Sequence, residues 1–178
     1  GYPTVHLKYN TNTAILSGDV MMIQAYQYLL RYDDPVLVKD MLQVFNKMAA
    51  EVCEGQQMDM DFETQETVTI GDYLEMITKK TSVLMGASFR LGAMIAGADI
   101  QDQVHIYEFA KNFGIAFQLQ DDILDTFGDG SQVGKKIGGD IVQNKKTYLY
   151  LKAMELSDNS QQDILIQLYS SKNIGFNP

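Results

Sequence analysis

The sequence is poor in cysteine, in proline and in long apolar runs, and each shortage excludes a class of protein. The only cysteine is Cys53, so no disulfide can form within the chain, and a reducing, cytoplasmic setting is predicted. The three prolines stand at positions 3, 35 and 178, which leaves long stretches free to form helices. No uncharged apolar run reaches the ~18 residues that suggest a membrane span. Residues 1–10 do not have the pattern of a signal peptide.

Positive charge is also scarce. Lysine and arginine number 14 against 23 aspartates and glutamates, which gives a net charge of −9. A chain this acidic repels nucleic acid and anionic lipid, so neither is an expected partner, and an anionic substrate would need a cation to bridge it. Hydrophobic residues make up 46% of the 178 residues, the composition of an ordinary globular protein. We therefore predict one domain over residues 1–178.

The spacing of apolar residues predicts an all-α fold of several helices around one core, and no segment alternates as a convincing strand. The helix over 101–127 is apolar on nearly every side and is expected to be central and buried. In the helix over 83–98, glycines at 86, 92 and 97 are expected to let neighbouring backbones come close. Polar residues 59–69 and glycine-rich residues 128–139 are predicted loops. The other helices are expected at about 13–31, 35–58, 70–80, 140–156 and 161–170.

Carboxylates gather at the end of the helix over 101–127. Asp121 and Asp125 are four residues apart and share a face, with Asp122 and Gln118 on the same stripe. The C-terminal end of a helix disfavours negative charge, so these acids break a local rule, as functional sites often do. A divalent cation such as Mg²⁺ would remove the repulsion and would commonly share its shell with substrate phosphates. The alternative is that the acids simply face solvent.

Basic residues follow these acids. Residues 128–140 contain five glycines together with Lys135 and Lys136, and Lys145 and Lys146 come shortly afterwards. Glycine lets backbone amides approach an anion, and lysine neutralises one. In so acidic a chain, this neighbourhood predicts a clamp for a metal ion and a diphosphate. The alternative is that the lysines are solvated surface residues.

Several motifs now identify a family resemblance. In order along the chain they are Thr13-Ala14-Ile15-Leu16-Ser17-Gly18-Asp19, Gly55-Gln56-x-x-Asp59, Lys80-Thr81, Phe117-Gln118-x-x-Asp121-Asp122-x-x-Asp125, Gly134-Lys135-Lys136-x-Gly138-Gly139-Asp140-Ile141 and Asn144-Lys145-Lys146-Thr147. Together they resemble the trans-type isoprenyl diphosphate synthases, also called polyprenyl synthetases, over essentially the whole chain. The resemblance implies a helical bundle of the isoprenoid synthase type and a homodimer. It also implies Mg²⁺-dependent condensation of an allylic diphosphate with isopentenyl diphosphate, which lengthens an isoprenoid chain.

The resemblance also assigns roles to individual residues. The aspartates of the family's second Asp-rich motif would hold magnesium, and these are Asp121, Asp122 and Asp125, with Asp121 and Asp125 favoured as the direct or water-mediated ligands. The catalytic residues would be Lys80, Thr81 and Gln118, with the oxygens of Thr81 and Gln118 aimed at the developing carbocation. The substrate-binding residues would be Lys80, Gln118, Lys136, Lys145 and Gln56, with Asp59 beside Gln56.

The sequence departs from the family at its ends. The family's first Asp-rich motif and its arginine pair should stand just before Gly1, and Asp33-Asp34-Pro35 does not replace them. The chain therefore reads as an internal fragment, truncated at both ends and expected to be inactive in prenyl transfer by itself. Two other functions stay open, a non-catalytic partner subunit of a prenyl synthase and a class I terpene cyclase. Intact Lys80, Thr81 and Gln118 favour the enzyme over the partner.

Overall fold

The computed structural model describes residues 2–128 and 138–170. All regular secondary structure in these residues is helical, which confirms the predicted all-α class. The chain divides into two compact units, Gly1–Asn46 and Lys47–Pro178. The single domain over residues 1–178 stays a prediction. No helix in the described stretches is both long enough and apolar enough to cross a membrane.

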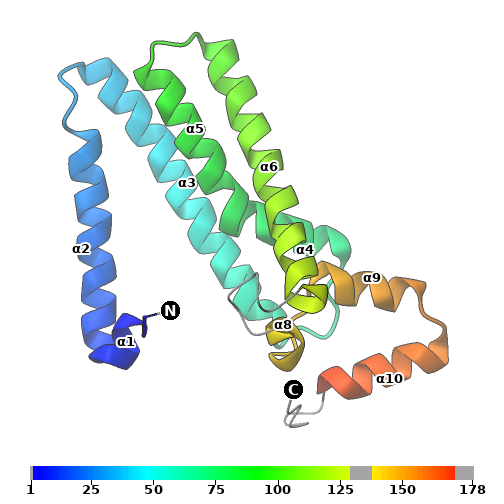
Figure 1. Ribbon diagram of the computed structural model, residues 1–178. Coiled ribbons are helices and arrows are strands. Elements are labelled where there is room, and N and C mark those ends of the chain that lie inside the picture. The colour runs from blue at the N-terminus through cyan, green and yellow to red at the C-terminus, as the bar shows by residue number, and fades with distance from the viewer. Residues whose placement is uncertain (1, 129–137, 171–178) are drawn as a thin grey trace. The chain divides into compact units, whose positions relative to one another are not determined.

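The first unit is a helical hairpin. It contains α1 (Val5–Lys8), α2 (Thr11–Leu29) and the start of α3 (Pro35–Phe62), with α2 and α3 joined by a tight turn (Figure 1). Asn10 fixes the start of α2, since its side chain accepts a hydrogen bond from the Thr13 backbone at 2.8 Å. The two helices meet through Tyr26, whose hydroxyl donates to Asn46 at 2.6 Å. No side chain of α2 is buried.

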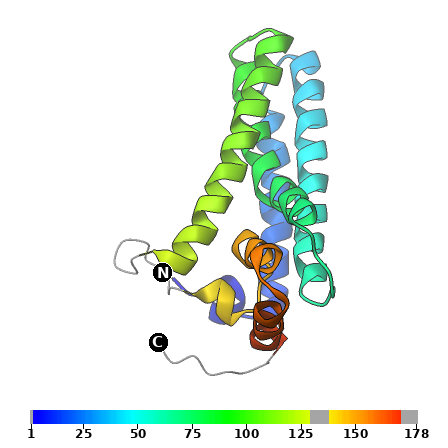
Figure 2. The ribbon, with the colours of Figure 1, turned by 90° about the vertical axis from the view of Figure 1, so that its right-hand side faces the viewer.

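The second unit contains the rest of α3 and the helices that follow. Both views place α5 and α6 side by side, running in opposite directions (Figure 2). Gly97, with φ of 77°, ends α5 in the left-handed conformation that glycine tolerates best. The helices are α4 (Ile70–Ile77), the π-helix η1 (Thr78–Ser82), α5 (Val83–Ile95), α6 (Ile100–Phe127), α8 (Gly139–Val142), α9 (Tyr148–Leu156) and α10 (Asn159–Ser170).

Glycines of α5 and α6 each allow a close approach within this unit. A Cβ atom at Gly86 would lie 2.9 Å from the Tyr107 ring, and one at Gly114 would lie 2.8 Å from the Ser82 Cα. Gly92 has open space instead, so only Gly86 among the three glycines of α5 and its end plays the predicted packing role. The contact at Gly114 fixes α6 against η1, the segment that carries Lys80 and Thr81.

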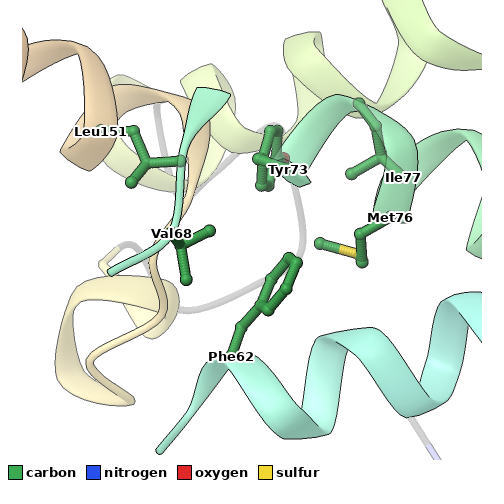
Figure 3. Packing of buried hydrophobic residues seen from close by; sticks show 6 residues of the cluster. All are labelled: Phe62, Val68, Tyr73, Met76, Ile77 and Leu151. Atoms are coloured by element: carbon green, nitrogen blue, oxygen red, sulfur yellow. The ribbon is translucent and has the colours of Figure 1, made fainter. Parts of the chain in front are cut away.

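A small apolar core lies where α3 ends and α4 begins. Its members point toward one another in Figure 3 and come from α3, α4, α9 and the 63–69 loop. The Thr69–Asp72 capping box starts α4 beside this core. Because the same helix runs on into η1, the core fixes the base of the π turn. The core residues are Phe62, Val68, Tyr73, Met76, Ile77 and Leu151.

Two sequence predictions need correction. The helix expected over 140–156 is two helices, α8 and α9, because the chain turns at Asn144, which has φ of 54°. The helix expected over 101–127 is not buried all round. Among its residues only Ala110, Gly114 and Asp122 are buried, since α5 and η1 cover one face and leave Phe113 exposed.

Candidate active site

A pocket of about 360 Å³ lies in the second unit. Its walls come from the end of α3, from α4 and η1, from the last turns of α6 and from residues 139–147. Most of the described residues that the sequence predicts to be functional meet here. They are Lys80, Thr81, Gln118, Asp121, Asp122, Asp125 and Lys145, with Asp59 beside them.

The π-helix η1 is a functional feature that the sequence reasoning missed. A π turn carries one more residue per turn than the α-helices on either side, so it rotates its side chains relative to theirs, and such turns are frequent at functional sites. Lys79 points away from the pocket and pairs with Glu54 at 3.2 Å and with Glu75 at 3.0 Å. Lys80 points into it and pairs with Asp59 at 2.5 Å. The side chains of Lys79 and Lys80 therefore point to opposite sides of the π turn.

A chain of hydrogen bonds runs from the pocket into the core. The Thr81 hydroxyl donates to Gln118 Oε1 at 3.4 Å, and Gln118 Nε2 donates to Asp122 Oδ1 at 3.2 Å. The Tyr73 hydroxyl donates to the other carboxylate oxygen, Oδ2. Tyr73 and Asp122 are each only 3% exposed. Burial raises the pKa of Asp122 above its usual value, although the hydrogen bonds from Tyr73 and Gln118 oppose the shift.

Asp125 and α8 form the opposite side of the pocket. The Asp125 carboxylate accepts the backbone N–H of Asp140 at 2.9 Å, so it lies at the start of α8. Asp140 in turn pairs with Lys145 Nζ at 2.9 Å. Burial works against the charged form of Lys145, but Asp140 and neighbouring aspartates outweigh it and leave its pKa above the usual value. Lys145 is therefore a charged ammonium at the pocket wall.

Three other residues of the family motifs are not described candidates for binding an anion in this pocket. Lys146 lines the pocket, but it donates to the carbonyl oxygens of Phe62, at 3.0 Å, and Gln65, and so holds the end of α3. Gln56 is exposed on α3 and is not part of the pocket wall. Lys136 lies outside the described residues. The pocket therefore keeps Lys80 and Lys145 as its described candidates for binding an anion.

The donor set of the pocket suits magnesium in combination with a diphosphate. Asp121 and Asp125 present carboxylate oxygens, the ligand type that Mg²⁺ prefers, at the pocket wall. Within residues 2–128 and 138–170, no three His, Cys, Asp or Glu side chains are gathered so that they could hold a metal ion alone. Mg²⁺ commonly takes one or two carboxylates and completes its shell with water and phosphate oxygens. Asp121 and Asp125, in the same pocket as Lys80 and Lys145, fit that pattern.

Known proteins are similar to this chain in sequence and in fold. The polyprenyl synthetase family model matches residues 1–175. A short chain isoprenyl diphosphate synthase from Methanocaldococcus jannaschii is 38% identical over 98% of this chain and 53% of its own length. A geranylgeranyl diphosphate synthase from Methanosarcina mazei is 40% identical over 87% of this chain and 48% of its own length.

Solved structures of related proteins have a similar fold. The crystal structure of geranylgeranyl pyrophosphate synthetase from Pyrococcus horikoshii has a TM-score of 0.85 at 39% identity, over 93% of this chain and 51% of that one. The fold is thus the all-α fold of isoprenyl synthases. The chain belongs to the polyprenyl synthetase family. It spans about half the length of the curated relatives it matches.

Proposed function

We propose that the protein is a Mg²⁺-dependent prenyltransferase that joins an allylic diphosphate to isopentenyl diphosphate. The observation that supports this most is the pocket, which gathers a set of candidate functional groups from η1, from α6 and from the segment after α8. These groups are Asp121, Asp125, Lys80, Lys145 and the Thr81–Gln118 pair. The names of the relatives, which are isoprenyl and geranylgeranyl diphosphate synthases, point the same way. A subunit that only bound a partner would have no need for this set of groups.

The proposed reaction places a different demand on each side of the pocket. The carbon–oxygen bond of the allylic diphosphate breaks, and the diphosphate leaves with the electron pair. Lys80 and Lys145 bind the diphosphate oxygens, and since an ammonium has three N–H donors each can do so while paired with its aspartate, Asp59 or Asp140. Asp121 and Asp125 would hold Mg²⁺, whose charge would offset the charge that develops on the leaving group.

The carbon that is left behind becomes positive. The oxygens of Thr81 and Gln118 lie on the pocket wall and are the dipoles available to stabilise it. The double bond of isopentenyl diphosphate then attacks this carbon, and a proton is lost. A homodimer is proposed as well, on the family resemblance, and a cytoplasmic setting stays a prediction based on the single cysteine.

The test is isothermal titration of inorganic pyrophosphate, with and without Mg²⁺, into the protein expressed from its complete reading frame. Asp121→Asn and Asp125→Asn should each weaken Mg²⁺-dependent binding about tenfold or more, because each removes a charged ligand. Asp163→Asn, on the exposed side of α10, is the matched control and should change nothing. Unchanged binding in both pocket variants would mean that the metal site is elsewhere.

A second assay separates elongation from cyclisation. Radiolabelled isopentenyl diphosphate should appear in a longer diphosphate ester when an allylic diphosphate is supplied. A terpene cyclase would instead release a hydrocarbon or alcohol without incorporating the label. Failure to incorporate label together with intact Mg²⁺–pyrophosphate binding would favour the cyclase or the partner subunit.

A further inference from the structure

Asp122 differs in its surroundings from the two aspartates beside it. It is only 3% exposed, and two side-chain hydrogen-bond donors converge on its carboxylate. The Tyr73 hydroxyl donates to Oδ2, and the Gln118 side-chain amide donates to Oδ1. A carboxylate whose oxygens are occupied in this way is poorly placed to coordinate a metal in the pocket. Its position implies a different task from that of Asp121 and Asp125.

The task follows from the chemistry of an amide. The end of a glutamine side chain has an NH₂ group that only donates and an oxygen that only accepts. Because an ionised carboxylate can only accept, the NH₂ group of Gln118 must face Asp122. The Gln118 oxygen is therefore turned the other way, toward Thr81. The hydrogen bond from Tyr73 holds the carboxylate itself in place.

We propose that Asp122 and Tyr73 are positioning residues that lock the Gln118 amide with its oxygen toward the pocket. The inference rests on the proposed function, since it gives that orientation a purpose, the stabilisation of positive charge on the allylic carbon. A reversed amide would present NH₂ hydrogens, which are the positive end of the dipole, to the same carbon. The orientation of one amide group then decides whether Gln118 helps or opposes ionisation.

Asp122→Asn is the variant that tests this best, because it preserves size while it removes the charge and replaces one acceptor with a donor. Tyr73 still needs an acceptor, so it keeps the remaining oxygen, and the introduced NH₂ group faces Gln118. Gln118 must then turn its own oxygen toward position 122 and its NH₂ group toward Thr81. We expect kcat to fall about 100-fold. The affinity for Mg²⁺–pyrophosphate should stay within about threefold, since no metal ligand has been removed.

A double variant distinguishes positioning from general damage. Gln118→Leu removes the amide altogether and should itself lower kcat. If Asp122 acts through Gln118, adding Asp122→Asn to Gln118→Leu should lower kcat no further, whereas independent effects would multiply. Tyr73→Phe leaves the bond between Asp122 and Gln118 in place and should therefore cost less than Asp122→Asn.

The amide can also be observed directly, without any activity assay. In ¹⁵N-correlated NMR spectra, the side-chain NH₂ signal of Gln118, assigned by its loss in Gln118→Leu, should be protected from solvent exchange. Asp122→Asn should remove that protection. Equal exchange in both proteins would overturn the proposal, as would multiplicative kcat losses or a loss of Mg²⁺–pyrophosphate affinity matching that of Asp125→Asn. Intact Mg²⁺–pyrophosphate binding in both Asp121→Asn and Asp125→Asn would overturn the proposed metal site instead and leave the NMR result standing.

Discussion

Gly55 of α3 lies directly against the backbone of Lys80. A Cβ atom at residue 55 would stand 2.3 Å from the Lys80 backbone nitrogen, far inside van der Waals contact. Gly55 is buried, so the neighbouring chain has no room to move away. The absence of a side chain at this one position of α3 thus lets the π turn approach and places the Lys80 ammonium beside Asp59.

Gly55→Ala should therefore destabilise the protein, although alanine ordinarily favours a helix over glycine by about 0.5–1 kcal/mol. The clash with backbone atoms should cost about 1–3 kcal/mol of unfolding free energy, measured by urea denaturation. Mg²⁺–pyrophosphate binding should weaken as Lys80 is displaced. Gly92→Ala is the control, since nothing lies within 4 Å of the added atom, and it should be neutral or slightly stabilising.

The two lysines of the π turn should contribute very differently to the affinity for Mg²⁺–pyrophosphate. Lys80→Ala removes an ammonium that faces the pocket and should weaken Mg²⁺–pyrophosphate binding about tenfold or more, because charged hydrogen bonds contribute about 1.5–3 kcal/mol. Lys79→Ala removes an equal charge one residue away, on the side of Glu54 and Glu75, and should leave affinity within about threefold. Similar losses in both variants would show that net charge matters rather than the direction of the π turn.

The raised pKa of Tyr73 predicts that the free energy of unfolding falls as the pH rises in the alkaline range. Burial, with the hydrogen bond to Asp122 added, raises its pKa well above the ordinary 10.0. Above pH 10 the unfolded chain releases this proton while the folded protein keeps it, so rising pH favours unfolding by up to about 1.4 kcal/mol per unit.

Tyr73→Phe should accordingly be the less stable protein at pH 8, where it lacks the hydrogen bond to Asp122. Its free energy of unfolding should then fall less steeply than that of the wild type between pH 10 and pH 11.5. Urea denaturation at several pH values measures both trends. A constant gap between the two proteins would show that Tyr73 ionises as readily in the fold as in the unfolded chain.

Exposed apolar residues on α2 predict that the protein assembles as a dimer. Leu16, Val20 and Ile23 recur at steps of four and three, and each is more than half exposed. An apolar stripe of this kind is typical of an interface between copies. The double variant Leu16→Glu/Ile23→Glu should sediment as a monomer at micromolar concentration, whereas wild type and Thr11→Glu should sediment as dimers. A monomeric wild type would contradict the proposed homodimer.

Local sequence signals predicted some helix starts, but the start of α2 at Thr11 lies two residues before the expected residue 13 although Asn10 caps it. Pro35 starts α3 as expected, and Thr69 starts α4. The end of α3 lies four residues later than the predicted residue 58, because Lys146, distant in sequence, caps its final carbonyls. The break at Asn144 went unpredicted because asparagine adopts a left-handed conformation only at some positions, and nothing local to it announces which.

The sequence by itself determined the all-α class, the family and many of the residues that meet in the pocket, because helical periodicity and motif spacing are properties of the chain. It assigned Asp121, Asp122 and Asp125 to magnesium and favoured Asp121 and Asp125 as the ligands. Only the tertiary structure shows what Asp122 contacts instead. Tyr73, 49 residues before Asp122, turns that carboxylate into the core, and Gly55 brings the π turn close enough to aim Lys80 at the pocket. Burial and hydrogen-bond direction depend on which helices pack together, and that is decided by contacts between residues far apart in the chain.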